Sequence, residues 1–239
     1  MGQKCPECAA PIGRNKVIYA RNIRHVDRTT TPITWALIAI NVAIFLIGYL
    51  DPTTRLEIFR NGAQIPQLID TGEVWRLFSA MFLHANFTHM LFNMWALYLF
   101  GPAIERRFGP VSFAAIYLAA GLGGGSLYHV LGRLSPAVGA SGAIFGLMGA
   151  LLAATFRQRH TPAGRAVFSQ LMLLLVINLT LPFVIPNIAW EAHLGGLVAG
   201  VAISAAWDKV PHGQPGAVLQ RVFIASTVSI IAVGAMLIL

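Results

Sequence analysis

Long apolar segments are the feature of this sequence that most restricts its fold. Seven segments reach or approach the roughly 20 apolar residues that a helix needs to cross a bilayer. They are residues 33–50, 77–100, 111–131, 136–156, 166–186, 192–207 and 222–239. The chain of 239 residues is 56% hydrophobic and 11% charged, whereas soluble domains are about 25% charged. We therefore expect an all-α polytopic membrane protein.

The basic residues indicate how the chain is oriented in the membrane. A formal net charge of +8 could suggest nucleic-acid binding, but Lys and Arg are spread over the segments between apolar runs. With a cytoplasmic N-terminus, thirteen of the 17 Lys and Arg residues fall inside and four outside. Because cytoplasmic segments carry an excess of these residues, we predict an N-terminus inside and a C-terminus outside. A bacterial inner membrane is the expected location, with no nucleic-acid partner.

Three parts follow from this pattern. Residues 1–31 form a basic cytoplasmic segment, residues 32–208 hold the first six spans, and residues 209–239 add a linker and a seventh. The first part contains Cys5-Pro-Glu-Cys8, which resembles half of a zinc ribbon. Structural zinc needs four ligands, so zinc at Cys5 and Cys8 would require a second chain or another partner. We predict no other metal site and no cofactor.

Ser141 is the first of four polar residues at membrane depth that could carry chemistry. It begins an apolar run and has small neighbours in Gly139-Ala140-Ser141-Gly142. Free backbone N–H groups at a helix start would stabilise charge that develops near its hydroxyl, as a nucleophile requires. The alternative is helix packing, since Gly142 and Gly146 form a small-xxx-small motif.

His193 lies among small residues in the sixth apolar segment, where a neighbouring helix could approach closely. A neutral imidazole there could accept the serine proton as a general base. The alternative is a histidine bonded to a backbone carbonyl. Glu191 is two residues away and would point to nearly the opposite side of a helix, so the pattern favours a Ser–His dyad over a triad.

His89 and Asn93 are four residues apart and share one helix face. Both could donate hydrogen bonds toward an oxyanion, or they could join two helices. His84 would lie about 140° round the helix from His89 and is not expected on this face. By the predicted topology, Ser141, His193, His89 and Asn93 all fall in the outer half of the bilayer, which favours a common role.

These residues give the sequence a resemblance to the rhomboid intramembrane serine proteases. It extends from about residue 33 to residue 207, in matching order and topology. The motifs that carry it are Glu73-Val-Trp-Arg76, His84-x-x-x-x-His89-x-x-x-Asn93, Glu105-Arg106-Arg107-Phe108-Gly109, Gly139-Ala-Ser141-Gly142 and Ala192-His193-Leu-Gly-Gly.

The resemblance implies a six-helix core with an additional C-terminal helix. It implies Ser141 as nucleophile and His193 as general base, with His89, Asn93 and the Ser141 backbone N–H holding the oxyanion. The implied substrates are single-span membrane proteins, cut near their outer ends from a cavity that opens outward.

Two features concern access to the predicted site. Phe145 stands where the family often has Tyr, so its ring can still stack on His193 but a hydroxyl is absent. Prolines interrupt the link between the fifth and sixth spans, and we expect residues 183–190, ending at Trp190, to form a mobile cap. A protease-dead relative that only binds clients is the main alternative. A transporter is disfavoured because the polar residues stop in the outer half.

Overall fold

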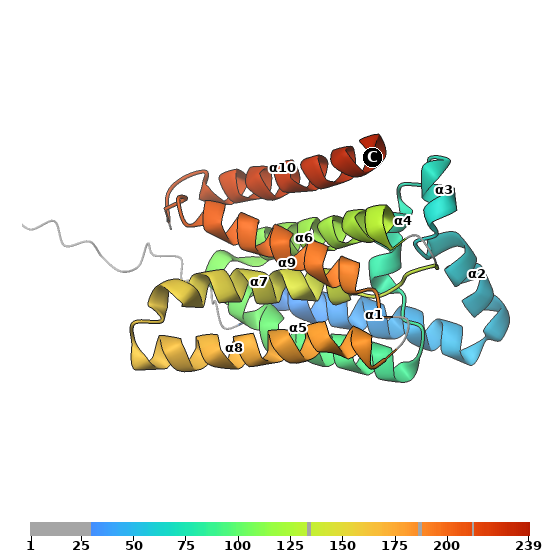
Figure 1. Ribbon diagram of the computed structural model, residues 1–239, viewed down its shortest axis with the longest axis horizontal. Coiled ribbons are helices and arrows are strands. Elements are labelled where there is room, and N and C mark those ends of the chain that lie inside the picture. The colour runs from blue at the N-terminus through green and yellow to red at the C-terminus, as the bar shows by residue number, and fades with distance from the viewer. Residues whose placement is uncertain (1–29, 133–134, 186–187, 212) are drawn as a thin grey trace, which may run out of the picture.

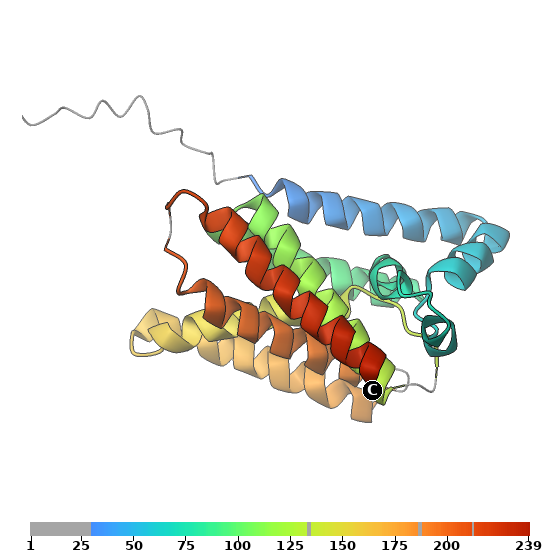
Figure 2. The same cartoon turned by 90° about the horizontal axis from the view of Figure 1, so that it is seen from above.

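The computed structural model describes residues 30–132, 135–185, 188–211 and 213–239 as a bundle of helices (Figure 1). The long helices alternate in direction along the bundle (Figures 1 and 2). In chain order the helices are α1 (Pro32–Leu50), α2 (Pro52–Gly62), α3 (Pro66–Asp70), α4 (Arg76–Ser79), the 3-10 turn η3 (Ala80–Phe82), α5 (Phe87–Phe108), α6 (Pro110–Leu131), α7 (Ser141–Gln158), α8 (Pro162–Thr180), the 3-10 turn η4 (Leu181–Phe183), α9 (Trp190–Trp207) and α10 (Ala217–Ile238).

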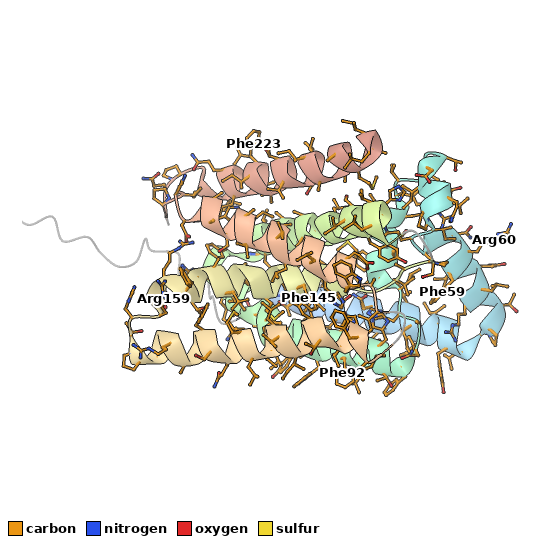
Figure 3. All side chains as sticks on the ribbon, in the orientation of Figure 1. Phe59, Arg60, Phe92, Phe145, Arg159 and Phe223 are labelled. Carbon is orange, nitrogen blue, oxygen red and sulfur yellow. The ribbon has the colours of Figure 1, made fainter. Side chains whose placement is uncertain are left out.

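The helices agree with an all-α membrane protein. Four of those described are long and apolar enough to cross a membrane, namely Pro32–Leu50, Pro110–Leu131, Pro162–Phe183 and Ala217–Ile238. Large apolar side chains project from the bundle, including Phe92 and Phe223, which are 58% and 71% exposed (Figure 3). Such a surface suits contact with lipid. His89 and Asn93 lie on α5, Ser141 on α7 and His193 on α9.

Several predicted boundaries are wrong, and two of them are starts that come too late, since α8 begins at Pro162 and α10 at Ala217. The second span does not begin at residue 77, because residues 76–82 form α4 and η3, and the long helix starts at Phe87. It also continues through Gly101 and Pro102 to Phe108. Packing explains this continuation, since a Cβ at Gly101 would lie 2.8 Å from the Thr34 side chain of α1. A glycine there therefore lets the two helices approach.

The fourth predicted span is also too long at its start. Residue 137 pairs with Gln64 in an isolated antiparallel bridge, with backbone N···O distances of 3.0 and 2.9 Å. Gly139 then has φ of +132°, which a helix cannot contain. The helix therefore starts at Ser141. By contrast, α9 begins at Trp190, two residues before the predicted sixth segment.

The centre of the bundle is formed by α6, α7 and α9. Glycines let these helices touch through their backbones. A Cβ at Gly196 of α9 would lie 1.9 Å from the Gly142 carbonyl oxygen of α7, and one at Gly124 of α6 would lie 2.6 Å from the Ala192 carbonyl oxygen. Side chains are therefore excluded from these crossings, and α7 and α9 keep a close fixed approach.

The two outer helices are attached by buried polar groups. Glu105, at 2% exposure, accepts hydrogen bonds from the backbone N–H groups of Ile33 and Thr34 at 2.9 and 2.8 Å, which satisfies the N-terminus of α1. At the same end of the bundle, the Trp207 indole donates to the Arg221 carbonyl of α10 at 3.0 Å. From there α10 runs obliquely across α6 (Figure 2).

Candidate active site

Ser141 lies at the first position of α7, at the end of an extended segment. The Gly139 N–H donates to the Ala80 carbonyl at 2.9 Å, which holds the turn before the helix. The Ala140 carbonyl accepts from Ile144, so the N–H groups of Ser141, Gly142 and Ala143 precede the intrahelical ladder. The serine hydroxyl therefore stands beside donors that have no partner within their own helix.

His193 meets Ser141 across the α7–α9 contact. The distance from His193 Nε2 to Ser141 Oγ is 3.0 Å, within hydrogen-bond range. The residues are 52 positions apart in the chain, so this contact depends on the glycine crossings. When Nδ1 carries the imidazole proton, the serine hydroxyl donates to Nε2, which is the arrangement that base-assisted attack requires.

The imidazole of His193 is oriented by an aromatic ring. Phe145, one turn after Ser141, stacks on it with ring centroids 4.1 Å apart and an interplanar angle of 8°. Figure 3 shows Phe145 inside the bundle. The Nδ1 atom of His193 is buried without a hydrogen-bond partner among the described residues. Glu191 therefore makes no hydrogen bond to the His193 imidazole.

His89 also approaches Ser141. A Cβ built on Gly139 would lie 2.8 Å from the Nε2 and Cε1 atoms of His89 and 3.8 Å from Ser141 Oγ. The imidazole edge therefore lies against the turn that carries the serine. Asn93 lies one turn further along α5, and its Nδ2 donates to the His89 carbonyl at 2.9 Å. The amide retains a second N–H.

His84 differs from its expected position. It precedes α5, and its ring packs edge-on against His89 with centroids 5.1 Å apart. The helical angle used in the prediction does not apply, because the chain between the two histidines includes the turn that Asn86 caps. The two rings are therefore direct neighbours.

Sequence reasoning also missed Gln64. Its Nε2 donates to the Gly125 carbonyl at 2.7 Å, and it lines a cavity of about 40 Å³ together with Gly139, Ser141 and Ala189. A buried water occupies roughly 10–15 Å³ by a comparable measure, so this cavity has room for waters or a small side chain next to the hydroxyl. A single glutamine between spans gives no indication in the sequence that it lies beside Ser141.

The remaining predicted residues lie apart from this cluster. Trp190 is the first residue of α9 and is 45% exposed. Phe183 and Val184, at the end of α8, are 89% and 80% exposed. Cys5 and Cys8 lie outside the described residues, so the zinc prediction remains a prediction.

Several known proteins are similar in sequence to this chain. A family model for the rhomboid domain matches residues 71–207. Rhomboid protease GluP of Bacillus subtilis is 36% identical over 205 residues, covering 84% of this chain and 39% of GluP. Putative rhomboid protease YdcA of the same organism is 34% identical over 175 residues, covering 72% of this chain and 87% of YdcA. Rhomboid protease AarA of Providencia stuartii is 32% identical, covering 75% of this chain and 74% of AarA.

The chain spans about two fifths of the length of GluP, but most of YdcA and AarA. The matched region of the family model contains α5, α6, α7, α8 and α9, and with them the cluster around Ser141. This chain therefore belongs to the rhomboid family of intramembrane proteases.

Proposed function

We propose that the protein is an intramembrane serine endopeptidase that cleaves single-span membrane proteins through a dyad of Ser141 and His193. The observation that carries the proposal is the 3.0 Å separation of Ser141 Oγ and His193 Nε2. The names of the relatives, which are rhomboid proteases, support the same reaction class.

The reaction proceeds by acyl transfer. Ser141 Oγ attacks the scissile carbonyl carbon while His193 Nε2 accepts the hydroxyl proton. Collapse of the tetrahedral intermediate breaks the C–N bond, and His193 returns the proton to the departing amine. A water molecule, deprotonated by His193, then attacks the acyl-enzyme ester and releases the second product with restored Ser141. Every proton is accounted for by one imidazole, and no cofactor takes part.

His89, the Ser141 backbone N–H and Asn93 are proposed to hold the oxyanion. The support is the placement of the His89 imidazole against Gly139 and Ser141. Removing one donor from an oxyanion hole typically lowers kcat by about 10²–10³. We expect a reduction of this order in kcat for His89→Ala, with a smaller change in KM, measured on a reconstituted membrane substrate.

Asn93 offers a matched comparison for this role. On α8, Asn178 donates to the carbonyl four residues earlier at 2.8 Å, the same local bond that Asn93 makes. Asn93→Ala should lower kcat, whereas Asn178→Ala should leave it close to wild type. Equal effects of the two substitutions would assign Asn93 a purely helical role.

The proposed gate for substrates is the cap of residues 183–190 together with the end of α8, and residues 186 and 187 of this cap lie outside the described part of the chain. In the described residues, α8 is held through a cluster with α7 that includes Met148 and Leu175, and Phe183 beyond it is exposed. A crosslink between cysteines introduced at Met148 and Leu175, with Cys5→Ser and Cys8→Ser, should slow cleavage of a membrane substrate without slowing labelling by a small probe. Unchanged cleavage would reject the gate.

The protease-dead alternative is tested by a serine-reactive fluorophosphonate. We expect the probe to label the wild-type protein and to leave Ser141→Ala unlabelled, because only a hydroxyl activated by a base reacts readily. His193→Ala should label far more slowly. A wild-type protein that stays unlabelled while folded would favour the client-binding alternative.

The orientation is also a proposal. The basic residues Arg106, Arg107, Arg157, Arg159 and Lys209 lie at the ends of helices α5, α7 and α9 that are opposite to Ser141. A cytoplasmic location for that end follows the positive-inside rule and places the proposed dyad toward the outer face. The bacterial inner membrane and the six-plus-one arrangement stay predictions of the sequence.

A further inference from the structure

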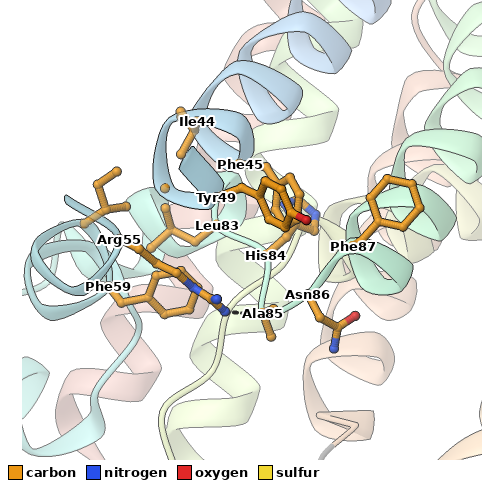
Figure 4. A pocket seen from close by; sticks show the side chains of 12 residues that line it. Ile44, Phe45, Tyr49, Arg55, Phe59, Leu83, His84, Ala85, Asn86 and Phe87 are labelled. Carbon is orange, nitrogen blue, oxygen red and sulfur yellow. Dashed lines mark hydrogen bonds between the residues drawn. The ribbon is translucent and has the colours of Figure 1, made fainter. Parts of the chain in front are cut away.

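A second cavity, separate from the one at Ser141, lies between α1, α2 and the chain leading into α5. Its volume is about 200 Å³, and Figure 4 shows the side chains that line it. Ile44, Phe45 and Phe59 supply apolar walls, while Arg55 and Tyr49 stand at its edge. The lining includes one cationic side chain and no carboxylate. This combination suits an anionic group that carries an apolar chain.

The Arg55 guanidinium is held in place at this cavity. Its Nη2 donates to the Ala85 carbonyl at 2.5 Å, and the group lies 5.5 Å from the Phe59 ring centroid. The bond to Ala85 leaves donors on Nη1 and Nε for a ligand. The acids nearest in sequence, Glu57 and Asp51, are not part of the lining, and Asp51 accepts hydrogen bonds from the Thr53 and Thr54 backbone.

His84 supplies an independent indication of a ligand. Its side chain lines the cavity and is 2% exposed. Neither ring nitrogen has a hydrogen-bond partner in the described part of the chain. Buried polar atoms are normally satisfied, so an unpaired imidazole at a cavity wall calls for a partner from outside the chain. A turn of the ring would present one of these nitrogens to an acceptor oxygen in the cavity.

The size and position of the cavity indicate a lipid. Pockets that enclose a whole drug-sized ligand measure about 300–1,000 Å³, so this one holds part of a larger molecule. It lies where α1 ends and α2 begins, at the Ser141 end of the bundle (Figure 1). Phe87 and Tyr49, at 58% and 68% exposure, extend the apolar surface from its edge toward the bilayer, as aromatic side chains do at headgroup level.

We propose that this cavity binds the phosphodiester group of a glycerophospholipid, with Arg55 and His84 as donors and the aromatic walls against the glycerol and the first carbons of the chains. Arginine pairs with phosphate through paired charge-assisted hydrogen bonds. The acyl chains remain in the bilayer. The site is independent of the proposed dyad, although His84 connects its wall to His89.

Native mass spectrometry of the full chain in detergent, titrated with palmitoyl-oleoyl phosphatidylglycerol, tests the proposal. We expect one tightly bound lipid. Arg55→Gln should weaken its binding about tenfold, since one charge-assisted bond is lost. Arg60→Gln removes the same charge from the same helix outside the cavity and should bind as wild type. Equal binding by the two variants would overturn the proposal.

Two further arms make the result decisive. Ile44→Trp fills the cavity and keeps the charge, so it should also lose the lipid, while Ile40→Trp, one turn earlier on α1, should not. Ile44→Trp decides the question if Arg55→Gln does not fold. Glycerol 3-phosphate at the same concentration should fail to displace the lipid. Displacement by it, or full binding by Ile44→Trp, would reject a phospholipid site.

Discussion

Alanine at position 141 should lower kcat for cleavage of a reconstituted single-span substrate by at least about 10³-fold, because the attacking atom is removed. His193→Ala should cause a loss of similar size, since it removes the imidazole that lies 3.0 Å from the hydroxyl. The double variant should be no worse than either single one, because the two residues act as a unit. The measurement is product formation in proteoliposomes under saturating substrate.

A matched control separates catalysis from packing. Ser204 is another buried serine on α9, and its hydroxyl donates to the Ala150 carbonyl of α7 at 3.1 Å. Ser204→Ala removes a hydroxyl from the same helix pair and should keep a kcat close to that of the wild-type protein. The loss of one hydrogen bond should lower the free energy of unfolding only slightly. Substantial activity in folded Ser141→Ala would remove the basis of the proposed mechanism.

Gly196→Ala should lower both the thermal stability and the cleavage activity of the protein, more than a substitution at an exposed position would. The Cβ of Gly196→Ala would lie 1.9 Å from the Gly142 carbonyl oxygen, so α9 must move away from α7. Overpacking of this kind costs about 1–3 kcal/mol, which corresponds to a Tm lower by about 2–12 °C. Cleavage should fall as well, because the same displacement separates His193 from Ser141.

Gly234 on α10 is the appropriate control, because a Cβ there would meet nothing within 4 Å. Gly234→Ala should therefore leave Tm and cleavage unchanged. If Gly196→Ala melts like the wild-type protein and cleaves normally, the close backbone approach of α7 and α9 does not determine the distance within the proposed dyad.

The sequence predicts the polar cluster well because a bilayer leaves few choices. Ser141, His193, His89 and Asn93 are costly at membrane depth, so their common depth already suggests that they meet. The structure brings Ser141, His193 and His89 together and stacks Phe145 on the His193 ring. The alternative of helix packing also applies, because Gly142 contacts α9 through its backbone while the adjacent Ser141 carries the hydroxyl.

Other features depend on contacts that no local pattern contains. The start of α7 at Ser141 follows from the pairing of residue 137 with Gln64, more than seventy positions earlier. The continuation of α5 past Pro102 follows from the fit of Gly101 against Thr34. Hydropathy records only that both stretches are apolar, so it extends one helix too far and ends the other too early.

The unpaired Nδ1 of His193 has an electrostatic consequence. A carboxylate at that atom would orient the ring but would add a permanent negative charge inside hydrocarbon, where a lone ion is very unfavourable. Here the flat face of Phe145 orients the ring without any charge. In the mechanism we propose, the resting centre is then electroneutral, and charges separate only when the proton passes from serine to imidazole.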